Sequence, residues 1–148
     1  MSDWGVPSVV SVERLIAADP QRIFDVLADP AQHQVIDGSG TVRDVQPGGP
    51  QRLSLGARFG MNMRLVVPYK ILNTVVEFDE PRRIAWRHFF GHVWRYTLEP
   101  GAGGTLVREE WDPKPALLPC ALVALGYPHR SRVGMHATLQ RLDALVTS

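Results

Sequence analysis

The sequence predicts an α+β fold: a curved antiparallel sheet wraps around a long C-terminal helix, with two short helices after the first strand. Three observations predict it. Near the N-terminus, an alternating segment runs into a helical segment that lies between the pairs Asp19-Pro20 and Asp29-Pro30. Residues 41–112 then read as strands and turns, and the chain ends in an amphipathic helix. Because the 148 residues contain no linker or repeat, we expect one domain over residues 1–148.

The N-terminal elements are predicted from alternation and from helix-capping residues. Alternating apolar and polar side chains indicate a strand over about Ser8 to Ala18. Asp19 can cap the following helix, Pro20 suits its first turn, and the second Asp-Pro pair ends it. Residues 31–36 are then expected to form another helical turn before the loop at residues 37–40, Asp-Gly-Ser-Gly.

The middle of the chain is predicted to form an antiparallel meander. Between residues 57 and 66 the alternation is clean, and it places Phe59, Met61 and Met63 on one face. Segments rich in Gly and Pro join neighbouring strands as hairpins. The predicted strands are Thr41–Val45, Ala57–Val66, Tyr69–Asp79, Arg83–Phe90, His92–Glu99 and Thr105–Asp112.

The C-terminal segment from Pro128 to Val146 is predicted to be a helix with one buried side. We expect Arg132 and His136 to flank that side in solvent. The apolar stripe follows spacings of four, three and four: Met135, Leu139, Leu142 and Val146.

Composition argues against several classes of partner. Lys and Arg number 16 against 15 for Asp and Glu, so neither nucleic acid nor an anionic membrane is an expected partner. The single Cys120 excludes an intrachain disulfide, and we expect it to be a buried structural thiol. The apolar run Ala116 to Gly126 is too short to span a membrane by roughly half, so no stable insertion is expected. The N-terminus lacks a signal-peptide pattern, so a cytoplasmic location is expected.

No motif indicates a metal, a cofactor or a hydrolase. The five His residues include no His-Glu-x-x-His pattern, and the Gly-rich segments join antiparallel strands rather than a strand and a helix, so neither a metal nor a cofactor is expected. His33, Asp37 and Ser39 lack a Gly-x-Ser-x-Gly elbow, and Asp37 is expected to cap backbone amides instead. His88 and His92 straddle a turn and can approach each other.

Short motifs along most of the chain resemble one superfamily. They are Ala18-Asp19-Pro20, Ile23-Phe24, Leu27-Ala28-Asp29-Pro30, Pro81 to Trp86, Trp94-Arg95-Tyr96 and Gly104-Thr105. This pattern resembles the START, Bet v 1 and polyketide cyclase-dehydrase superfamily, the helix-grip (SRPBCC) proteins. The segments Ile36 to Gly40, Phe59 to Met63, Val76 to Phe78 and Met135 to Leu142 are further similar to an actinobacterial group within it.

The resemblance implies a helix-grip fold with an internal cavity. The function that we expect from it is binding or carriage of a small hydrophobic molecule, lipid-like or aromatic, such as a polyketide. One alternative is a polyketide cyclase or dehydrase, a lyase with acid-base residues in the same cavity. Another alternative is a protein-interaction module that uses an exposed apolar stretch: Leu117, Leu118, Leu122 and Leu125. A homodimer is also one of the expected possibilities.

The predicted ligand-binding residues share the inward face of the sheet or the helix stripe. They are Phe59, Met61, Met63, Trp86, His88, Trp94, Tyr96, Val107, Met135, Leu139 and Leu142. The alternative is that these side chains form an ordinary packed core. A register error of one residue would turn each strand's side chains to the opposite face.

The last strand offers the candidate catalytic residue Glu109. By analogy with the superfamily, Thr105, Val107, Glu109 and Trp111 face inward; the other register presents Leu106, Arg108 and Glu110. An interior Glu109 would act as a general base, with His88 or Tyr96 as the proton donor. The alternative is that Glu109 lies at a strand end and meets water or Arg95.

Overall fold

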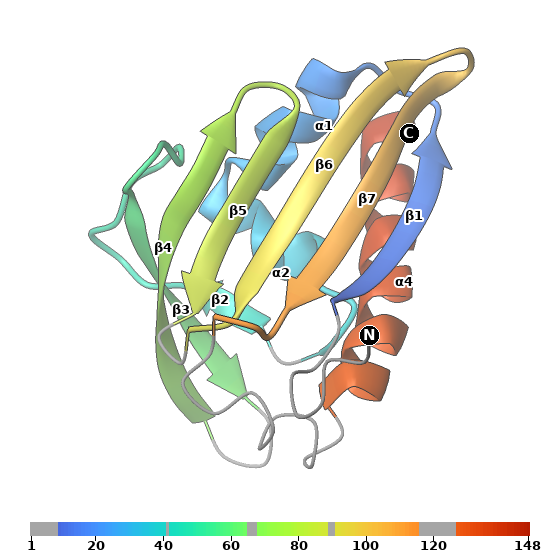
Figure 1. The fold of residues 1–148 in the computed structure, drawn as a ribbon. Coiled ribbons are helices and arrows are strands. Elements are labelled where there is room, and N and C mark those ends of the chain that lie inside the picture. Colours follow the sequence, from blue (N-terminus) through green and yellow to red (C-terminus); the bar gives the residue numbers. More distant parts are fainter. Residues whose placement is uncertain (1–8, 41, 65–67, 89–90, 116–126) are drawn as a thin grey trace.

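The strands of the described chain form one antiparallel sheet that curves around the C-terminal helix (Figure 1). The computed structural model describes residues 9–40, 42–64, 68–88, 91–115 and 127–148. The seven strands lie in the order β1-β7-β6-β5-β4-β3-β2, so the first strand pairs with the last one. They are β1 Val10–Ile16, β2 Val42–Val45, β3 Arg58–Arg64, β4 Pro68–Asp79, β5 Arg83–His88, β6 Val93–Gly101 and β7 Gly104–Asp112.

The described helices lie on one side of this sheet (Figure 1). They are α1 Pro20–Leu27, the 3-10 turn η1 Pro30–Gln32, α2 His33–Ile36 and α4 Tyr127–Thr147. The predicted cap is confirmed, because the Asp19 carboxylate accepts a hydrogen bond of 3.0 Å from the Arg22 amide. The predicted fold class, with two short helical segments after the first strand, is therefore confirmed.

The sheet face that packs on these helices, called the inner face below, carries the core. On β7, Thr105, Val107, Glu109 and Trp111 are buried, which confirms the favoured register of the last strand. The alternative placement of Glu109 beside water or Arg95 is wrong. Arg95 instead points to the opposite face, where it lies opposite Glu110.

A bulge in β4 shifts its pairing with β5. Val75 lies opposite Trp86 on β5, but Glu77 lies opposite Ala85, so Val76 is an extra residue on this strand. Val75 on one side of the bulge and Phe78 on the other both pack into the core. Such a bulge bends its strand and increases the local twist, which helps the sheet to curl.

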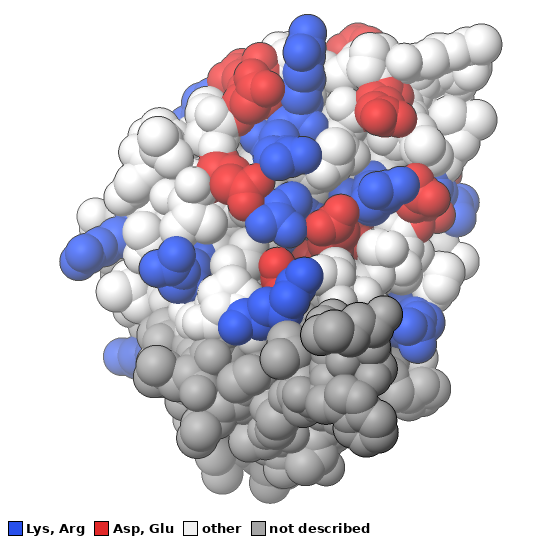
Figure 2. Space-filling view, in the orientation of Figure 1, with Lys and Arg blue, Asp and Glu red and all other residues white. Residues whose placement is uncertain are grey.

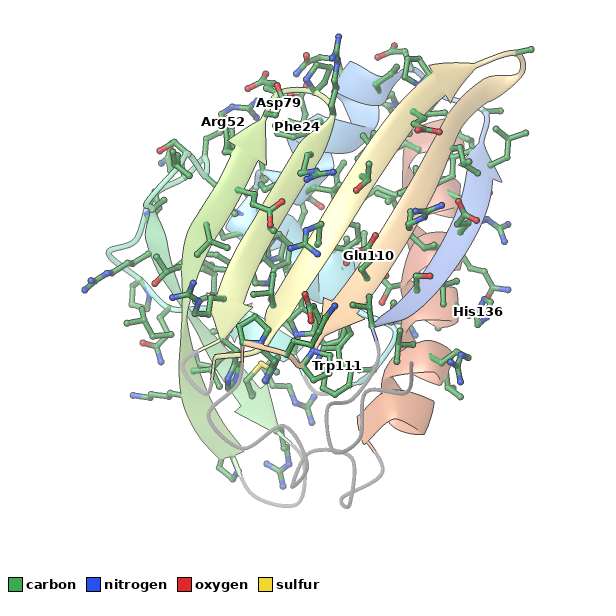
Figure 3. The ribbon with its side chains drawn as sticks, in the orientation of Figure 1. Phe24, Arg52, Asp79, Glu110, Trp111 and His136 are labelled. Carbon is green, nitrogen blue, oxygen red and sulfur yellow. The ribbon has the colours of Figure 1, made fainter. Side chains whose placement is uncertain are left out.

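Helix α4 presents the predicted apolar stripe to the sheet. Arg132 and His136 are exposed, as expected, and His136 can be seen on α4 in Figure 3. Arg14 of β1 reaches α4 at the sheet edge, where its Nε lies 2.7 Å from the Asp143 carboxylate. The buried stripe consists of Met135, Leu139, Leu142 and Val146.

The loop at residues 37–40 is fixed to α4. The Gly38 amide donates a hydrogen bond of 2.9 Å to Thr138 Oγ1, and Arg141 donates one to the Asp37 carbonyl. A Cβ on Gly38 would lie 2.4 Å from Ala137 Cβ, far closer than packed carbon atoms allow. The absence of a side chain at Gly38 thus permits the loop to touch the helix.

The outer face of the sheet carries interspersed positive and negative charges (Figure 2). Arg95 is the centre of this arrangement: its guanidinium lies 2.6 Å from Glu77 on β4 and 3.1 Å from Glu110 on β7. Because it bridges strands on both sides of β6, Arg95 links three strands across the sheet.

Some sequence-based predictions concern residues outside the described ranges. Cys120, the apolar run from 116 to 126 and the leucines of the proposed interaction stretch all lie there. Within the described ranges, no helix is both long and apolar enough to cross a membrane.

Candidate functional site

A row of three tryptophans crosses the inner face of the sheet. Trp86 on β5 lies opposite Trp94 on β6, which in turn lies opposite Trp111 on β7. Trp86 and Trp111 are buried, whereas Trp94 between them is only half-buried. Figure 3 shows Trp111 near the end of β7 that lies away from the β6–β7 hairpin. Trp94 therefore presents part of an aromatic surface that its protein neighbours leave uncovered.

Trp86 belongs to an aromatic cluster that includes a histidine. Its ring lies 4.8 Å from the His33 ring in a stacked arrangement, 5.7 Å from Phe59 and 5.6 Å from Tyr96. His33 Nε2 donates a hydrogen bond of 2.9 Å to the Leu27 carbonyl. Burial lowers the pKa of His33, so its imidazole is neutral at neutral pH. Sequence reasoning missed this contact, because Trp86 and His33 meet only through tertiary packing.

Tyr96 and Glu109 form a polar pair on the same face. They lie directly opposite each other on β6 and β7, and the Tyr96 hydroxyl donates a hydrogen bond to the Glu109 carboxyl. Both residues are buried: 4% of the surface of Tyr96 and 3% of that of Glu109 is exposed. Glu109 Oε1 has no hydrogen-bond partner among the described residues. Within the described part of the chain, the pair therefore leaves one buried polar atom unsatisfied.

Burial sets the protonation state of this pair. Burial, with a smaller contribution from the negative charge of Asp37, raises the pKa of Glu109 to about 8, although the hydrogen bond from Tyr96 lowers it. Burial and the neighbouring Glu109 likewise place the pKa of Tyr96 well above its ordinary value. At neutral pH the pair is a carboxylic acid beside a phenol, and neither group is charged.

A second polar group lies on the other side of Trp86. Asn73 on β4 is opposite His88 on β5, and Asn73 Oδ1 has no hydrogen-bond partner among the described residues. His88 stacks on His92 at 4.5 Å, which confirms that these residues approach each other. Burial lowers the pKa of His88 to about 4 and that of His92 to about 3. The sequence reasoning did not select Asn73, since its local pattern is that of any strand residue.

The structure brings some predicted site residues together and separates others. Tyr96 and Glu109 are in contact, but His88 lies beyond Trp86 along β5, beside Asn73. Among the predicted ligand-binding residues, Met63, His88 and Trp94 are half-buried. The others are buried on the inner face or on α4: Phe59, Met61, Trp86, Tyr96, Val107, Met135, Leu139 and Leu142.

His33, Asp37 and Ser39 do not form a catalytic triad. The Asp37 carboxylate accepts hydrogen bonds from the Ser39 amide at 3.1 Å and the Ser39 hydroxyl at 2.6 Å, and from the Val42 amide at 3.2 Å. This confirms that Asp37 caps backbone amides. His33 instead forms a hydrogen bond with the Leu27 carbonyl and stacks on Trp86. Within the described ranges, no three His, Cys, Asp or Glu side chains gather in a way that could hold a metal ion.

A surface cleft of about 620 Å³ lies apart from the inner-face residues. It runs between the α1–η1 region, including Asp25 and Asp29, and the segment from Val45 to Arg52. Arg52 is held there by ion pairs of 3.3 Å to Asp25 and 2.8 Å to Glu80. The cleft contains none of the predicted ligand-binding or catalytic residues.

Comparison with known proteins shows the family of this chain. A family model described as polyketide cyclase / dehydrase and lipid transport matches residues 8–147. The chain belongs to this family. This match confirms the superfamily resemblance that the sequence motifs indicated.

One relative is similar to this chain in sequence, and several solved structures share its fold. The uncharacterized protein Rv0088 of Mycobacterium tuberculosis is 36% identical over 95 residues, which cover 63% of this chain but only 42% of that protein. Crystal structures of CV1439 from Chromobacterium violaceum and NE0264 from Nitrosomonas europaea match with TM-scores of 0.74 and 0.75. At 19% and 15% identity they cover 96% and 99% of this chain and 99% and 97% of their own, which establishes a shared fold.

Proposed function

We propose that this protein binds a small apolar molecule between the inner face of its sheet and the helices behind it. The observation that carries the proposal is the tryptophan row, in which Trp94 stays half-buried between two buried neighbours. Aromatic rings offer a large apolar area and lose little conformational entropy when a ligand covers them. The family description, which includes lipid transport, supports the same function.

The half-buried residues indicate where such a molecule would make contact. Met63, His88 and Trp94 lie on the inner face on different strands, and each is half-buried. Thioether and aromatic side chains adapt to apolar ligands of varied shape. We therefore expect binding to depend on Trp94 more than on any residue of the outer face.

Energy transfer from tryptophan to pyrene tests this function directly. The wild-type protein should bind pyrene saturably, and Trp94→Ala should weaken binding at least about tenfold, since a buried aromatic contact contributes more than 1.4 kcal/mol. Leu72→Ala is the matched control, because Leu72 is an exposed apolar residue on the outer face of β4. Native mass spectrometry of the purified protein should also detect a co-purifying apolar compound. Failure of pyrene, biphenyl and palmitic acid to bind would refute the proposal.

Acid-base catalysis in the same place is a second candidate function, and the Tyr96–Glu109 pair favours it. A carboxyl group with a pKa of about 8 can exchange a proton near neutral pH, as a general acid or base must. His88 is not adjacent to this pair. The candidate function therefore depends on Glu109 and Tyr96 and not on all three predicted residues.

Turnover of a poly-β-ketone thioester would distinguish catalysis from binding alone. If the chain is a cyclase or dehydrase, Glu109→Gln should abolish product formation and leave the dissociation constant nearly unchanged. His88→Ala should affect turnover much less, because its ring lies beyond Trp86. Absence of any product with the wild-type protein would leave binding as the function and eliminate the enzyme.

A further inference from the structure

We propose that Glu109 Oε1 is the polar anchor of the ligand site and that it selects an uncharged apolar ligand with a hydroxyl or carbonyl oxygen. The inference rests on the proposed binding function and adds the chemical class of the ligand. Its basis is a buried carboxyl oxygen on the inner face with no hydrogen-bond partner among the described residues.

The surroundings of Glu109 place this oxygen beside the tryptophan row. Along β7 its neighbour on the inner face is Trp111, and across β6 it lies next to Tyr96, one inner-face position from Trp94. A ligand that covers the exposed part of Trp94 would therefore bring a substituent close to Glu109. A buried polar atom without a partner costs about 1–3 kcal/mol, so a ligand oxygen that pairs with it gains affinity.

The charges near Glu109 disfavour an anionic ligand. The groups that act on it are the Tyr96 hydroxyl from β6, which donates a hydrogen bond to its carboxyl, and the Asp37 carboxylate at the end of α2, whose charge opposes a further negative charge in the site. Two nearby cations have other partners. Arg14 of β1 forms an ion pair with Asp143 of α4, and Arg141 of α4 donates a hydrogen bond to the Asp37 carbonyl. Since no described cation pairs with Glu109, a buried carboxylate ligand would stay uncompensated.

Burial reinforces this preference because it keeps Glu109 itself uncharged at neutral pH. A neutral carboxyl group can donate as well as accept a hydrogen bond. It can therefore serve either a hydroxyl or a carbonyl oxygen. A hydrocarbon without oxygen would leave Oε1 unpaired, just as it is in the described structure.

Three biphenyl probes of almost equal size test the inference: biphenyl, 4-hydroxybiphenyl and biphenyl-4-carboxylate. Their dissociation constants are measured by equilibrium dialysis at pH 7. We expect 4-hydroxybiphenyl to bind about five- to tenfold more tightly than biphenyl, the effect of one good hydrogen bond. We expect the carboxylate to bind more weakly than biphenyl, because its charge is desolvated without a partner.

Variants identify the residue responsible for this selectivity. Glu109→Leu should abolish the preference for 4-hydroxybiphenyl over biphenyl, whereas Glu109→Gln, which retains hydrogen-bonding groups, should preserve most of it. Asn73→Leu is the matched control, since Asn73 also has a buried unpartnered oxygen on the inner face but lies beyond Trp86. The ratio of two dissociation constants is used because a merely structural defect would weaken both probes together.

The outcomes separate this inference from the proposed function. Equal binding of the three probes, or an unchanged preference in Glu109→Leu, overturns the role of Glu109 and leaves apolar binding intact. Loss of the preference in Asn73→Leu instead of Glu109→Leu also overturns it. If no probe binds to the wild-type protein, both the function and the anchor are refuted. Should Glu109→Leu not fold, Glu109→Ala takes its place, and an unchanged preference in that variant overturns the role of Glu109.

Discussion

His33 lies almost parallel to Trp86, with ring centroids 4.8 Å apart and an interplanar angle of 22°. One residue comes from a four-residue helix and the other from the centre of the sheet. The contact therefore attaches the short helical segments to the inner face. The His33 ring packs in an apolar environment, because its hydrogen bond to the Leu27 carbonyl satisfies one of its nitrogen atoms.

His33→Ala should destabilise the protein by about 2–4 kcal/mol, because it removes a buried ring and leaves the Leu27 carbonyl unpaired. Urea denaturation measures the change. His136→Ala on the exposed side of α4 is the control and should alter stability by less than about 0.5 kcal/mol. Similar effects of the two substitutions would show that His33 does not support the fold.

Glu109 should make the protein less stable as the pH rises from about 4.5 to about 8. In that range the unfolded state has released the Glu109 proton and the folded state retains it, so the free energy of unfolding falls by roughly 1.4 kcal/mol per pH unit. Glu109→Gln should remove this slope and be the more stable protein at pH 8. Parallel pH profiles of the two proteins would contradict the assignment.

Tyr96→Phe should raise the pKa of Glu109 further, because the Tyr96 hydrogen bond favours the ionised carboxylate. NMR titration of the Glu109 side chain measures this directly. We expect the midpoint to move upward from about 8. A downward shift would mean that the Tyr96 hydroxyl does not donate to Glu109.

Acid should destabilise the protein through its buried histidines. Burial lowers the pKa values of His33, His88 and His92, so below the ordinary value of 6.5 the unfolded state takes up protons that the folded state does not. In a Glu109→Gln background, which removes the opposing carboxyl contribution, stability should fall steadily from pH 6.5 to pH 4. Urea midpoints that do not change over that range would show that the three rings are protonated in the folded protein.

Gly38→Ala should destabilise the protein by about 1–3 kcal/mol, because the added methyl group would lie 2.4 Å from Ala137 Cβ and 2.5 Å from the Thr138 amide nitrogen. Thermal unfolding measures the loss. Gly49→Ala is the matched control, since its Cβ would meet nothing closer than 4.0 Å. Equal melting temperatures for both variants would refute the close approach of the loop to α4.

Arg95→Met should cost about 1–2 kcal/mol, since Glu77 and Glu110 would lose a cation that lies largely out of solvent. Arg108→Met removes the more exposed ion pair to Glu13 and should leave the urea midpoint nearly unchanged. The loss in Arg95→Met should also shrink at low pH, because the Arg95 hydrogen bond lowers the pKa of Glu77 and protonation removes that stabilisation. A loss that is the same at every pH would argue against the ion pair.

The secondary structure could be predicted because local patterns express it directly. Asp19 caps α1, alternation places Phe59 and Met61 inside, and a helical stripe places Met135 against the sheet. Each of these depends on the identity and spacing of residues close together in the chain. The fold class follows from their order.

The candidate site could be predicted only in part, because it depends on which strands become neighbours. Tyr96 and Glu109 were both selected, but their pairing follows from the register of β6 against β7. His33 and Asn73 could not be selected, since a histidine in a short helix and an asparagine in a strand have no local signature of burial. The bulge at Val76 likewise depends on how β4 pairs with β5, which the local sequence does not reveal.

The unpaired Glu109 Oε1 has a practical consequence for finding the natural ligand. A compound that pairs with this oxygen binds the folded state alone and relieves a desolvation cost, so it stabilises that state according to its concentration and affinity. The melting temperature is then a readout of occupancy that requires no assumption about a reaction. Fractions of a cell extract can be screened for a rise in the melting temperature. A fraction whose compound pairs with this oxygen should raise the melting temperature of the wild-type protein more than that of Glu109→Leu.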